Sequence, residues 1–203
     1  MKRFLLLAAA ASLLTGGCGT QVTGTATTSV PSSARLPSDG APAVTIPITD
    51  TAAVEADPCS AIPTAEIEAI GGKVERSELE ALTMGKACAW IFQEGANTVS
   101  AGLVTGNKDG LSALYSQNAA GGLTTFKPVN PVNGYPAVIY ANGGEGRGTC
   151  TLAVGVRDDL VYTVIPRLGD DHPSSSDPCG MATKVAAAAI RNLNECQHLT
   201  PPN

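Results

Sequence analysis

The sequence predicts one α+β domain, in which helices pack against a single antiparallel sheet. Apolar and small residues alternate over 150–156, which is typical of a strand with one buried face. A turn at 157–159 and an apolar run over 160–165 then indicate a β-hairpin. After Asp177-Pro178, a capping residue followed by a proline, four apolar residues recur at steps of four and predict a C-terminal helix. These residues are Met181, Val185, Ala189 and Leu193.

Turn and capping signals predict the remaining elements. We expect, in chain order, a helix over 63–70 ended by two glycines, strands over 87–93 and 98–104, a helix capped by Asp109, and a strand over 137–140. The segment 73–82 is ambiguous. The order α-β-β-α-β-β-β-α favours an antiparallel sheet with helices packed against it.

The first eighteen residues indicate export. A basic start, Met1-Lys2-Arg3, precedes an apolar run over 4–14, and at 1.5 Å per residue that run is too short to cross about 30 Å of hydrocarbon. Residues 1–17 are therefore expected to be a signal peptide. Small residues directly before Cys18 resemble the lipobox of bacterial lipoproteins, which implies a diacylglyceryl group on Cys18. A lipobox usually has Leu where Thr15 stands here, so an ordinary secretory signal is the alternative.

We expect a disordered stalk between this signal and the folded domain. Residues 18–56 are rich in Thr, Ser, Pro, Ala and Gly, with too few large apolar side chains to offset the entropy of ordering. Such a stalk has a mean span of roughly 35 Å. The folded domain is then expected over 57–198, with a frayed tail over 199–203.

The charge balance argues against one class of partner. The chain has 13 basic and 18 acidic residues, and loss of Lys2 and Arg3 leaves 11 against 18, a net charge of −7. An acidic protein without a basic stripe is a poor candidate for binding nucleic acid. No later segment approaches eighteen consecutive apolar residues, so the lipid anchor is the expected contact with the membrane.

Besides Cys18, the chain has five cysteines, which is an odd number for a protein in an oxidising compartment. Five thiols allow fifteen ways of forming two bridges and one leftover. A straight C-terminal helix would hold Cys179 and Cys196 about 25 Å apart, beyond the roughly 7 Å between Cα atoms that a disulfide allows. Sequence proximity favours Cys59–Cys88 and Cys150–Cys179 and leaves Cys196 free or intermolecular.

Four short motifs follow one another behind the lipobox and the stalk. They are Asp57-Pro58-Cys59, Cys88-Ala89-Trp90, Cys150 in a strand, and Asp177-Pro178-Cys179. Together they resemble a family of actinobacterial lipoproteins of unknown function, over most of 57–193. The resemblance implies no activity, because none is established for the family, and Cys196 is extra to its pattern. Related envelope lipoproteins resemble PsbP-like α+β sandwiches, which is the architecture that the resemblance implies.

No metal or cofactor is expected. His172 lies among the aspartates of 170–177, and such an oxygen-rich loop suits calcium, but the spacing matches no calcium loop. No C-x-x-C occurs, and neither His172 nor His198 lies near a cysteine pair, which argues against zinc. Trp90 is on the same side of its strand as Cys88, so we expect it to pack on the Cys59–Cys88 bridge.

The sequence carries no catalytic motif, and we expect a non-enzymatic role. The leading hypothesis is a lipid-anchored module on the extracytoplasmic face of the cell membrane that binds an envelope protein or a small apolar ligand. A structural or stress-related envelope protein without ligand is the alternative. An envelope hydrolase is a third hypothesis, and a cleft joining a Ser or paired carboxylates to His172 would favour it. An apolar cavity would favour the ligand, and a flat apolar patch the protein partner.

Overall fold

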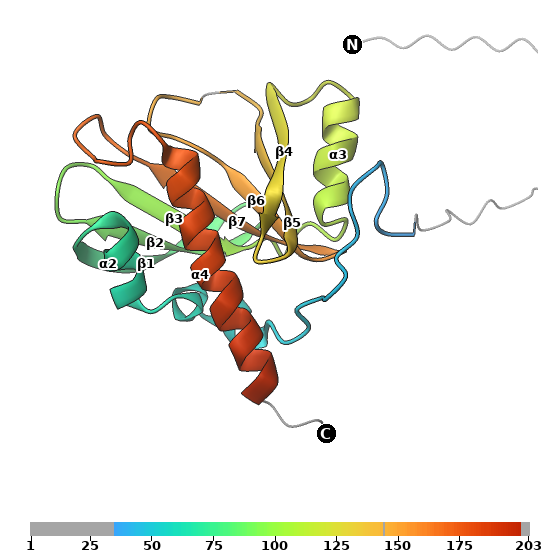
Figure 1. Cartoon of the computed structure of the whole chain (residues 1–203), viewed down its shortest axis with the longest axis horizontal. Coiled ribbons are helices and arrows are strands. Elements are labelled where there is room, and N and C mark those ends of the chain that lie inside the picture. The colour runs from blue at the N-terminus through green and yellow to red at the C-terminus, as the bar shows by residue number, and fades with distance from the viewer. Residues whose placement is uncertain (1–34, 144, 200–203) are drawn as a thin grey trace, which may run out of the picture. The chain divides into compact units, whose positions relative to one another are not determined.

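Seven strands form one antiparallel sheet in the order β1-β2-β3-β7-β6-β5-β4 (Figure 1), which confirms the α+β fold class. The computed structural model describes residues 35–143 and 145–199, with side chains through residue 195. The strands are β1 Val74–Leu82, β2 Gly85–Phe92, β3 Thr98–Leu103, β4 Thr125–Val132, β5 Tyr135–Ala141, β6 Leu152–Arg157 and β7 Leu160–Arg167. The helices are α1 Ala52–Ala56, the 3₁₀ helix η1 Pro58–Ala61, α2 Thr64–Gly71, α3 Leu111–Ala119 and α4 Pro178–Leu199.

The long helix α4 covers one face of the sheet, where it contacts β6 and β7. Its predicted stripe, Met181, Val185, Ala189 and Leu193, is buried in the main apolar core. The carboxylate of Asp177 caps the helix by accepting the backbone N–H of Gly180 at 2.9 Å. The alternating residues of β6 point into the same core, so both periodicities of the sequence meet at this interface.

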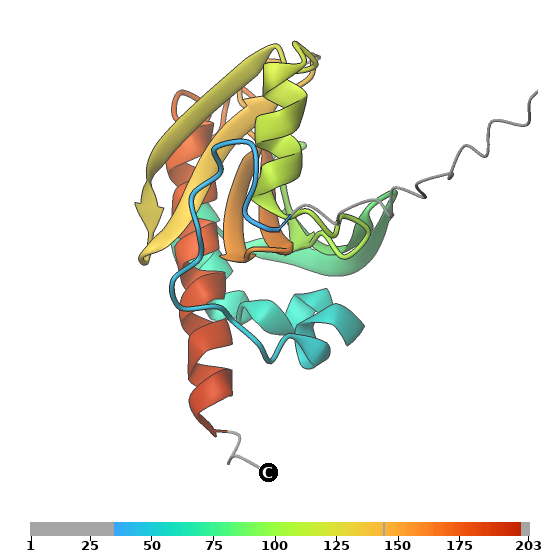
Figure 2. The ribbon, with the colours of Figure 1, turned by 90° about the vertical axis from the view of Figure 1, so that its right-hand side faces the viewer.

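The helix α3 covers part of the opposite face (Figure 2). Leu111 packs there with Val138, Ala153 and Val161 in a second, smaller apolar cluster. Gly155 makes room for this helix, because a Cβ at that position would lie 2.9 Å from the Leu111 side chain. The sheet is therefore buried on both faces at β6 and β7 and less completely toward its edges.

Residues 35–56, which we name the N-terminal strap, differ from the prediction. They were expected to be disordered stalk, but they lie against the domain and end in α1. Ile48 is fully buried, and its backbone N–H donates to the carbonyl of Val156 at 2.9 Å. The backbone N–H of Val44 donates to Asp158 Oδ1 at 2.8 Å. The predicted boundary at Asp57 is wrong, because buried apolar side chains and hydrogen bonds to β6 and its turn order this segment.

The strands that the sequence pattern missed are the two edges of the sheet. β1, the ambiguous segment, is exposed along most of its length, so no buried face imposes an alternating pattern. β4 contains Pro128 and Pro131, which read as strand breakers but are tolerated at an edge. β7 also contains a proline, Pro166, and the strand continues to Arg167 beside β3.

The predicted cap of α3 is also wrong. Gly110 occupies the N-cap position, and Asp109 instead uses its backbone carbonyl to accept the N–H of Ser112. A Cβ at Gly110 would lie 2.1 Å from the carbonyl oxygen of Asp158. Close approach of the β6–β7 turn therefore decides which residue begins this helix.

Candidate functional site

Two disulfides attach helical segments to strands of the sheet. Cys59 in η1 is bonded to Cys88 in β2, with a Cα–Cα distance of 4.8 Å. Cys150, just before β6, is bonded to Cys179 in the first turn of α4, with a Cα–Cα distance of 5.3 Å. These are the two pairs that sequence proximity favours. Trp90 is buried in the same apolar core as Cys88, with Cys59 packed against that core, so its indole is part of the scaffold.

The other cysteines of interest lie beyond the description. Cys18, the signal peptide 1–17 and the stalk up to residue 34 are outside the described residues. The side chains of Cys196 and His198 are also outside them. Lipidation of Cys18 and a free or intermolecular Cys196 therefore stay predictions.

His172 is buried, and backbone groups engage both of its ring nitrogens. Its Nδ1 accepts the N–H of Ser174 at 3.0 Å, so Nε2 carries the proton and donates to the carbonyl of Gly71 at 3.0 Å. Ser174 and Glu94 line the same depression, of about 260 Å³. The histidine has no free nitrogen with which to take a proton from a serine, because both are committed to the main chain.

The acidic residues around His172 do not converge on a common point. Asp170 forms an exposed ion pair with Arg147, and Asp177 caps α4. Within the described residues, no three His, Cys, Asp or Glu side chains come close enough to hold a metal ion together. We therefore assign no metal ligand and no cofactor-binding residue.

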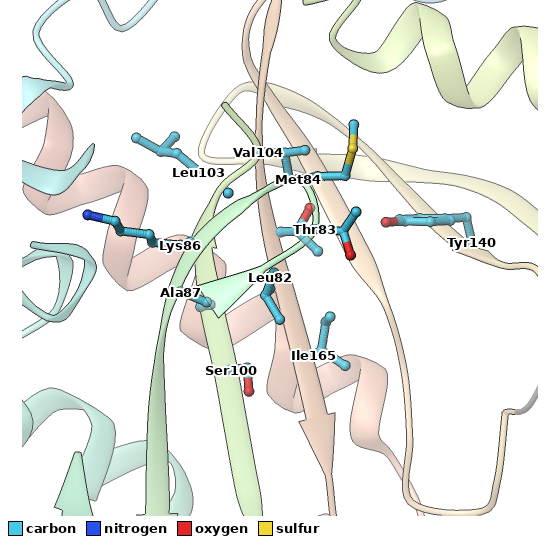
Figure 3. Close-up of a pocket in the computed structure, with 14 residues that line it drawn as sticks. Leu82, Thr83, Met84, Lys86, Ala87, Ser100, Leu103, Val104, Tyr140 and Ile165 are labelled. Carbon is cyan, nitrogen blue, oxygen red and sulfur yellow. The ribbon is translucent and has the colours of Figure 1, made fainter. Parts of the chain in front are cut away.

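An apolar recess lies beside the β1–β2 hairpin, and we name it the hairpin groove (Figure 3). It has a volume of about 290 Å³. Its main apolar lining residues are Leu82, Met84, Ala87, Val104, Tyr140 and Ile165. They come from the hairpin, the end of β3, β5 and β7, so no single stretch of sequence builds the groove.

The floor of the groove belongs to the α3 face of the sheet. Val99, Ala101 and Leu103 point into the main core, so Ser100 and Gly102 point to the other face of β3. Gly102 stands opposite Thr163 of β7. A Cβ on Gly102 would lie 2.3 Å from the carbonyl oxygen of Lys86, so β2 crosses β3 more closely here than any side chain allows. This crossing turns the hairpin over the sheet and leaves the recess beneath it.

Polar side chains are a minority of the lining, and two of them are hydroxyls on β7 and β5. Thr163 is nine-tenths buried, and its Oγ1 makes no hydrogen bond of normal geometry within the described residues. The phenol of Tyr140 points from β5 toward Thr83 of the hairpin (Figure 3). Burial raises the pKa of this phenol, and the nearby Thr163 hydroxyl lowers that pKa to a smaller extent. Tyr140 is therefore a neutral hydroxyl at neutral pH.

The mouth of the groove carries exposed apolar side chains. Leu82 is 41% exposed and Met84 is 45% exposed, both on the hairpin that overhangs the recess. Leu79 is 58% exposed on the same strand, but it stands opposite Cys88 and so belongs to the other face. An apolar recess with an apolar mouth and a few polar groups is the usual form of a small-ligand site.

Sequence reasoning did not find this site. Most of its residues are Ala, Gly, Ser, Thr and aliphatic side chains, and with Met84, Lys86 and Tyr140 they form no motif that signals chemistry by type or spacing. One available signal was Gly102 inside an apolar strand, because such a glycine often marks close approach of another backbone. The sequence alone does not say which backbone approaches it.

The model of one protein family matches residues 13–192, which include both disulfides and every residue of the hairpin groove. The chain belongs to this family, DUF3558. Its description is a protein of unknown function, so membership in DUF3558 transfers no activity to the groove. No curated protein and no solved structure matches the chain, so a PsbP-like architecture for DUF3558 stays a prediction. Among the described residues of this DUF3558 member, no helix is long and apolar enough to cross a membrane.

Proposed function

We propose that the protein is a lipid-anchored, non-enzymatic module on the extracytoplasmic face of the cell membrane, which binds a small apolar ligand in the hairpin groove. The observation that carries this proposal is the groove itself, an apolar recess of about 290 Å³ beneath exposed apolar side chains. Its volume is near the lower limit of small-molecule sites, so it suits a small molecule or one end of a larger one.

The anchor part of the proposal is supported by the sequence. The basic start, the short apolar run and the small residues before Cys18 resemble the lipobox of actinobacterial and other bacterial lipoproteins. Each buried methylene of an acyl chain contributes about 0.8 kcal/mol, so a diacylglyceryl group would hold the protein firmly at the bilayer. The two disulfides agree with an oxidising compartment outside the cytoplasm.

Fractionation of cells that express the Cys18→Ala variant tests the anchor. The unaltered protein is expected in the membrane fraction and the variant outside it, because the variant cannot receive the lipid. Cys196→Ala is the matched control, since it also removes one predicted thiol and should leave the protein with the membranes. Membrane retention of Cys18→Ala would exclude lipidation as the means of attachment.

Binding of an uncharged solvent-sensitive dye such as Nile red tests the groove. We expect Leu82→Ser to weaken binding several-fold, because it replaces an apolar side chain at the mouth with a polar one. Leu79→Ser is the matched control on the other face of β1 and should leave binding unchanged. Equal losses in both variants, or no binding by the unaltered protein, would contradict a ligand site at this place.

A protein partner that inserts an apolar side chain is the competing occupant of the groove. The small volume of the recess and its overhanging hairpin favour a ligand over a flat protein surface. An envelope hydrolase has less support, because both ring nitrogens of His172 are hydrogen-bonded to backbone groups. A structural protein without ligand predicts that Leu82→Ser leaves dye binding unchanged.

A further inference from the structure

The polar floor of the groove restricts what an apolar ligand must carry. Thr163 Oγ1 is buried without a hydrogen bond of normal geometry, although a buried hydroxyl costs free energy when it is left unpaired. The phenol of Tyr140 lies near this hydroxyl. Ser100, only 3% exposed, lies further along β3 on the same floor (Figure 3). The groove is therefore lined by the neutral hydroxyls of Thr163, Tyr140 and Ser100, by Thr83 and Lys86 of the hairpin, and otherwise by apolar groups.

The charges near the groove argue against an anionic ligand. Lys86 is the one charged residue among the described lining residues, and Figure 3 shows its ammonium end directed away from Tyr140, Met84 and Thr83. Glu80 stands opposite Ala87 across the β1–β2 pair, and its Oε2 is buried without a hydrogen bond. A ligand carboxylate would approach Glu80 without an opposing cation, and burial of an unpaired charge is costly.

The size of the recess limits how much of a molecule enters it. About 290 Å³ is slightly less than the range in which most small-molecule sites fall. A whole two-chain lipid does not fit this volume, whereas the end of one aliphatic chain with a single oxygen does. The mouth at Leu82 and Met84 would then contact the part of the chain that remains outside.

We propose that the hairpin groove binds a neutral aliphatic molecule that carries one hydroxyl or carbonyl oxygen, with this oxygen placed at the hydroxyls of Thr163 and Tyr140. This assignment of the ligand class rests on the proposed function of the groove. Each floor hydroxyl both donates and accepts, so an alcohol and an ester carbonyl meet the same two groups. The oxygen offers Thr163 a hydrogen bond of normal geometry, and the apolar walls bury the adjoining methylenes.

Titration with three eight-carbon probes tests the ligand class. The protein is the mature chain with Cys18→Ala, which contains every described residue, and the probes are n-octanol, n-octanoate and n-octane. Amide chemical shifts of Ser100, Gly102 and Thr163 report occupation of the groove and give the Kd of each probe. We expect n-octanol to bind about three- to tenfold more tightly than the other two, which is the factor that one net hydrogen bond supplies.

Variants of the floor identify the groups that select the oxygen. Thr163→Val keeps the shape of the side chain, and Tyr140→Phe keeps the ring, so each removes one hydroxyl alone. Each is expected to reduce the preference for n-octanol over n-octane, with little change in n-octane binding. Thr98→Val is the matched control at the other end of β3 and should leave the preference intact.

The outcomes separate the ligand class from the function of the groove. Equal binding of n-octanol and n-octane, tightest binding of n-octanoate, or an unchanged preference in both floor variants would overturn the ligand class and leave an apolar binding site. Absence of shifts at the groove residues with all three probes would overturn the binding function as well. A preference for n-octanol that both floor variants lose supports the assignment.

Discussion

Some buried hydroxyls in this protein are hydrogen-bonded and others are not, and we expect their removal to change the free energy of unfolding in different directions. Tyr135 donates from its phenol to Asn194 Oδ1 at 2.9 Å, which links β5 to α4. Tyr162 of β7 is completely buried in the main core, and its hydroxyl makes no hydrogen bond within the described residues. Burial raises the pKa of Tyr162 far above its usual value, because the core cannot solvate a phenolate. The two tyrosines therefore form a natural pair for comparison.

Removal of the Tyr162 hydroxyl should not destabilise the fold. We expect Tyr162→Phe to leave the free energy of unfolding unchanged or to raise it by about 1–2 kcal/mol, since a buried group without a partner is lost. Tyr135→Phe should instead lower it by about 1 kcal/mol, because a hydrogen bond is lost. Urea unfolding of both variants measures these values. A loss of more than about 1 kcal/mol in Tyr162→Phe would mean that this hydroxyl has a partner, such as a buried water.

At the scale of elements, α4 is held to the sheet by its apolar stripe and by one disulfide. Four residues at steps of four are buried against β6 and β7. Cys150–Cys179 fixes the first turn of the helix beside the start of β6. The other bridge, Cys59–Cys88, joins segments with the same sequence separation of 29 residues, but it holds η1 on β2 instead. Equal loops make the two bridges comparable in the entropy that they remove from the unfolded chain.

The two bridges should therefore contribute similarly to stability and differently to local exchange. Replacement of either pair by alanines is expected to lower the free energy of unfolding by about 3–4 kcal/mol. Only the Cys150→Ala/Cys179→Ala variant should also speed hydrogen exchange in the first turns of α4, because only that bridge holds them. Similar exchange in α4 for both variants would show that the apolar stripe alone fixes the helix.

At the scale of the whole molecule, the N-terminal strap completes the domain. Ile48 is fully buried in the main core, and Val54 of α1 is also buried there. The backbone N–H of Ser38 donates to Ser112 Oγ at 2.8 Å, which ties the strap to α3. In both ribbon views the strap runs beside α3 before it reaches the other helices (Figures 1 and 2). The part of the chain left for a stalk is shorter than the composition predicts, because residues 35–56 belong to the fold.

A chain shortened to begin at Asp57 should be less stable than one that begins at Gly19. We expect the free energy of unfolding to fall by at least about 3 kcal/mol, because the shortened chain leaves the sites of Ile48 and Val54 open to water. Within the chain that begins at Gly19, Ile48→Ala is expected to lower the free energy of unfolding by about 2–5 kcal/mol. Ile46→Ala is the matched control, because Ile46 is 72% exposed and should change stability by less than about 0.5 kcal/mol. Equal melting temperatures of the two chain lengths would show that the strap is dispensable.

The sequence by itself determined the parts whose signal is local. The stripe and cap of α4, the hairpin of β6 and β7, and the class of the fold follow from periodicity and capping, because each residue there faces one constant environment. The favoured cysteine pairs follow from the short loops that they close.

Only the tertiary structure decided the edges, the strap and the groove. β1 has no buried face and β4 contains prolines, so neither carries a strand pattern, and pairing with β2 and β5 is what makes them strands. Ile46 and Ile48 are alike in sequence, but only Ile48 is buried, and its burial depends on a site that β6 provides. The groove depends on the crossing of β2 over Gly102, which brings the hairpin above Thr163. Residues far apart in the chain meet there, and the local sequence pattern of one strand does not show how closely another strand approaches it.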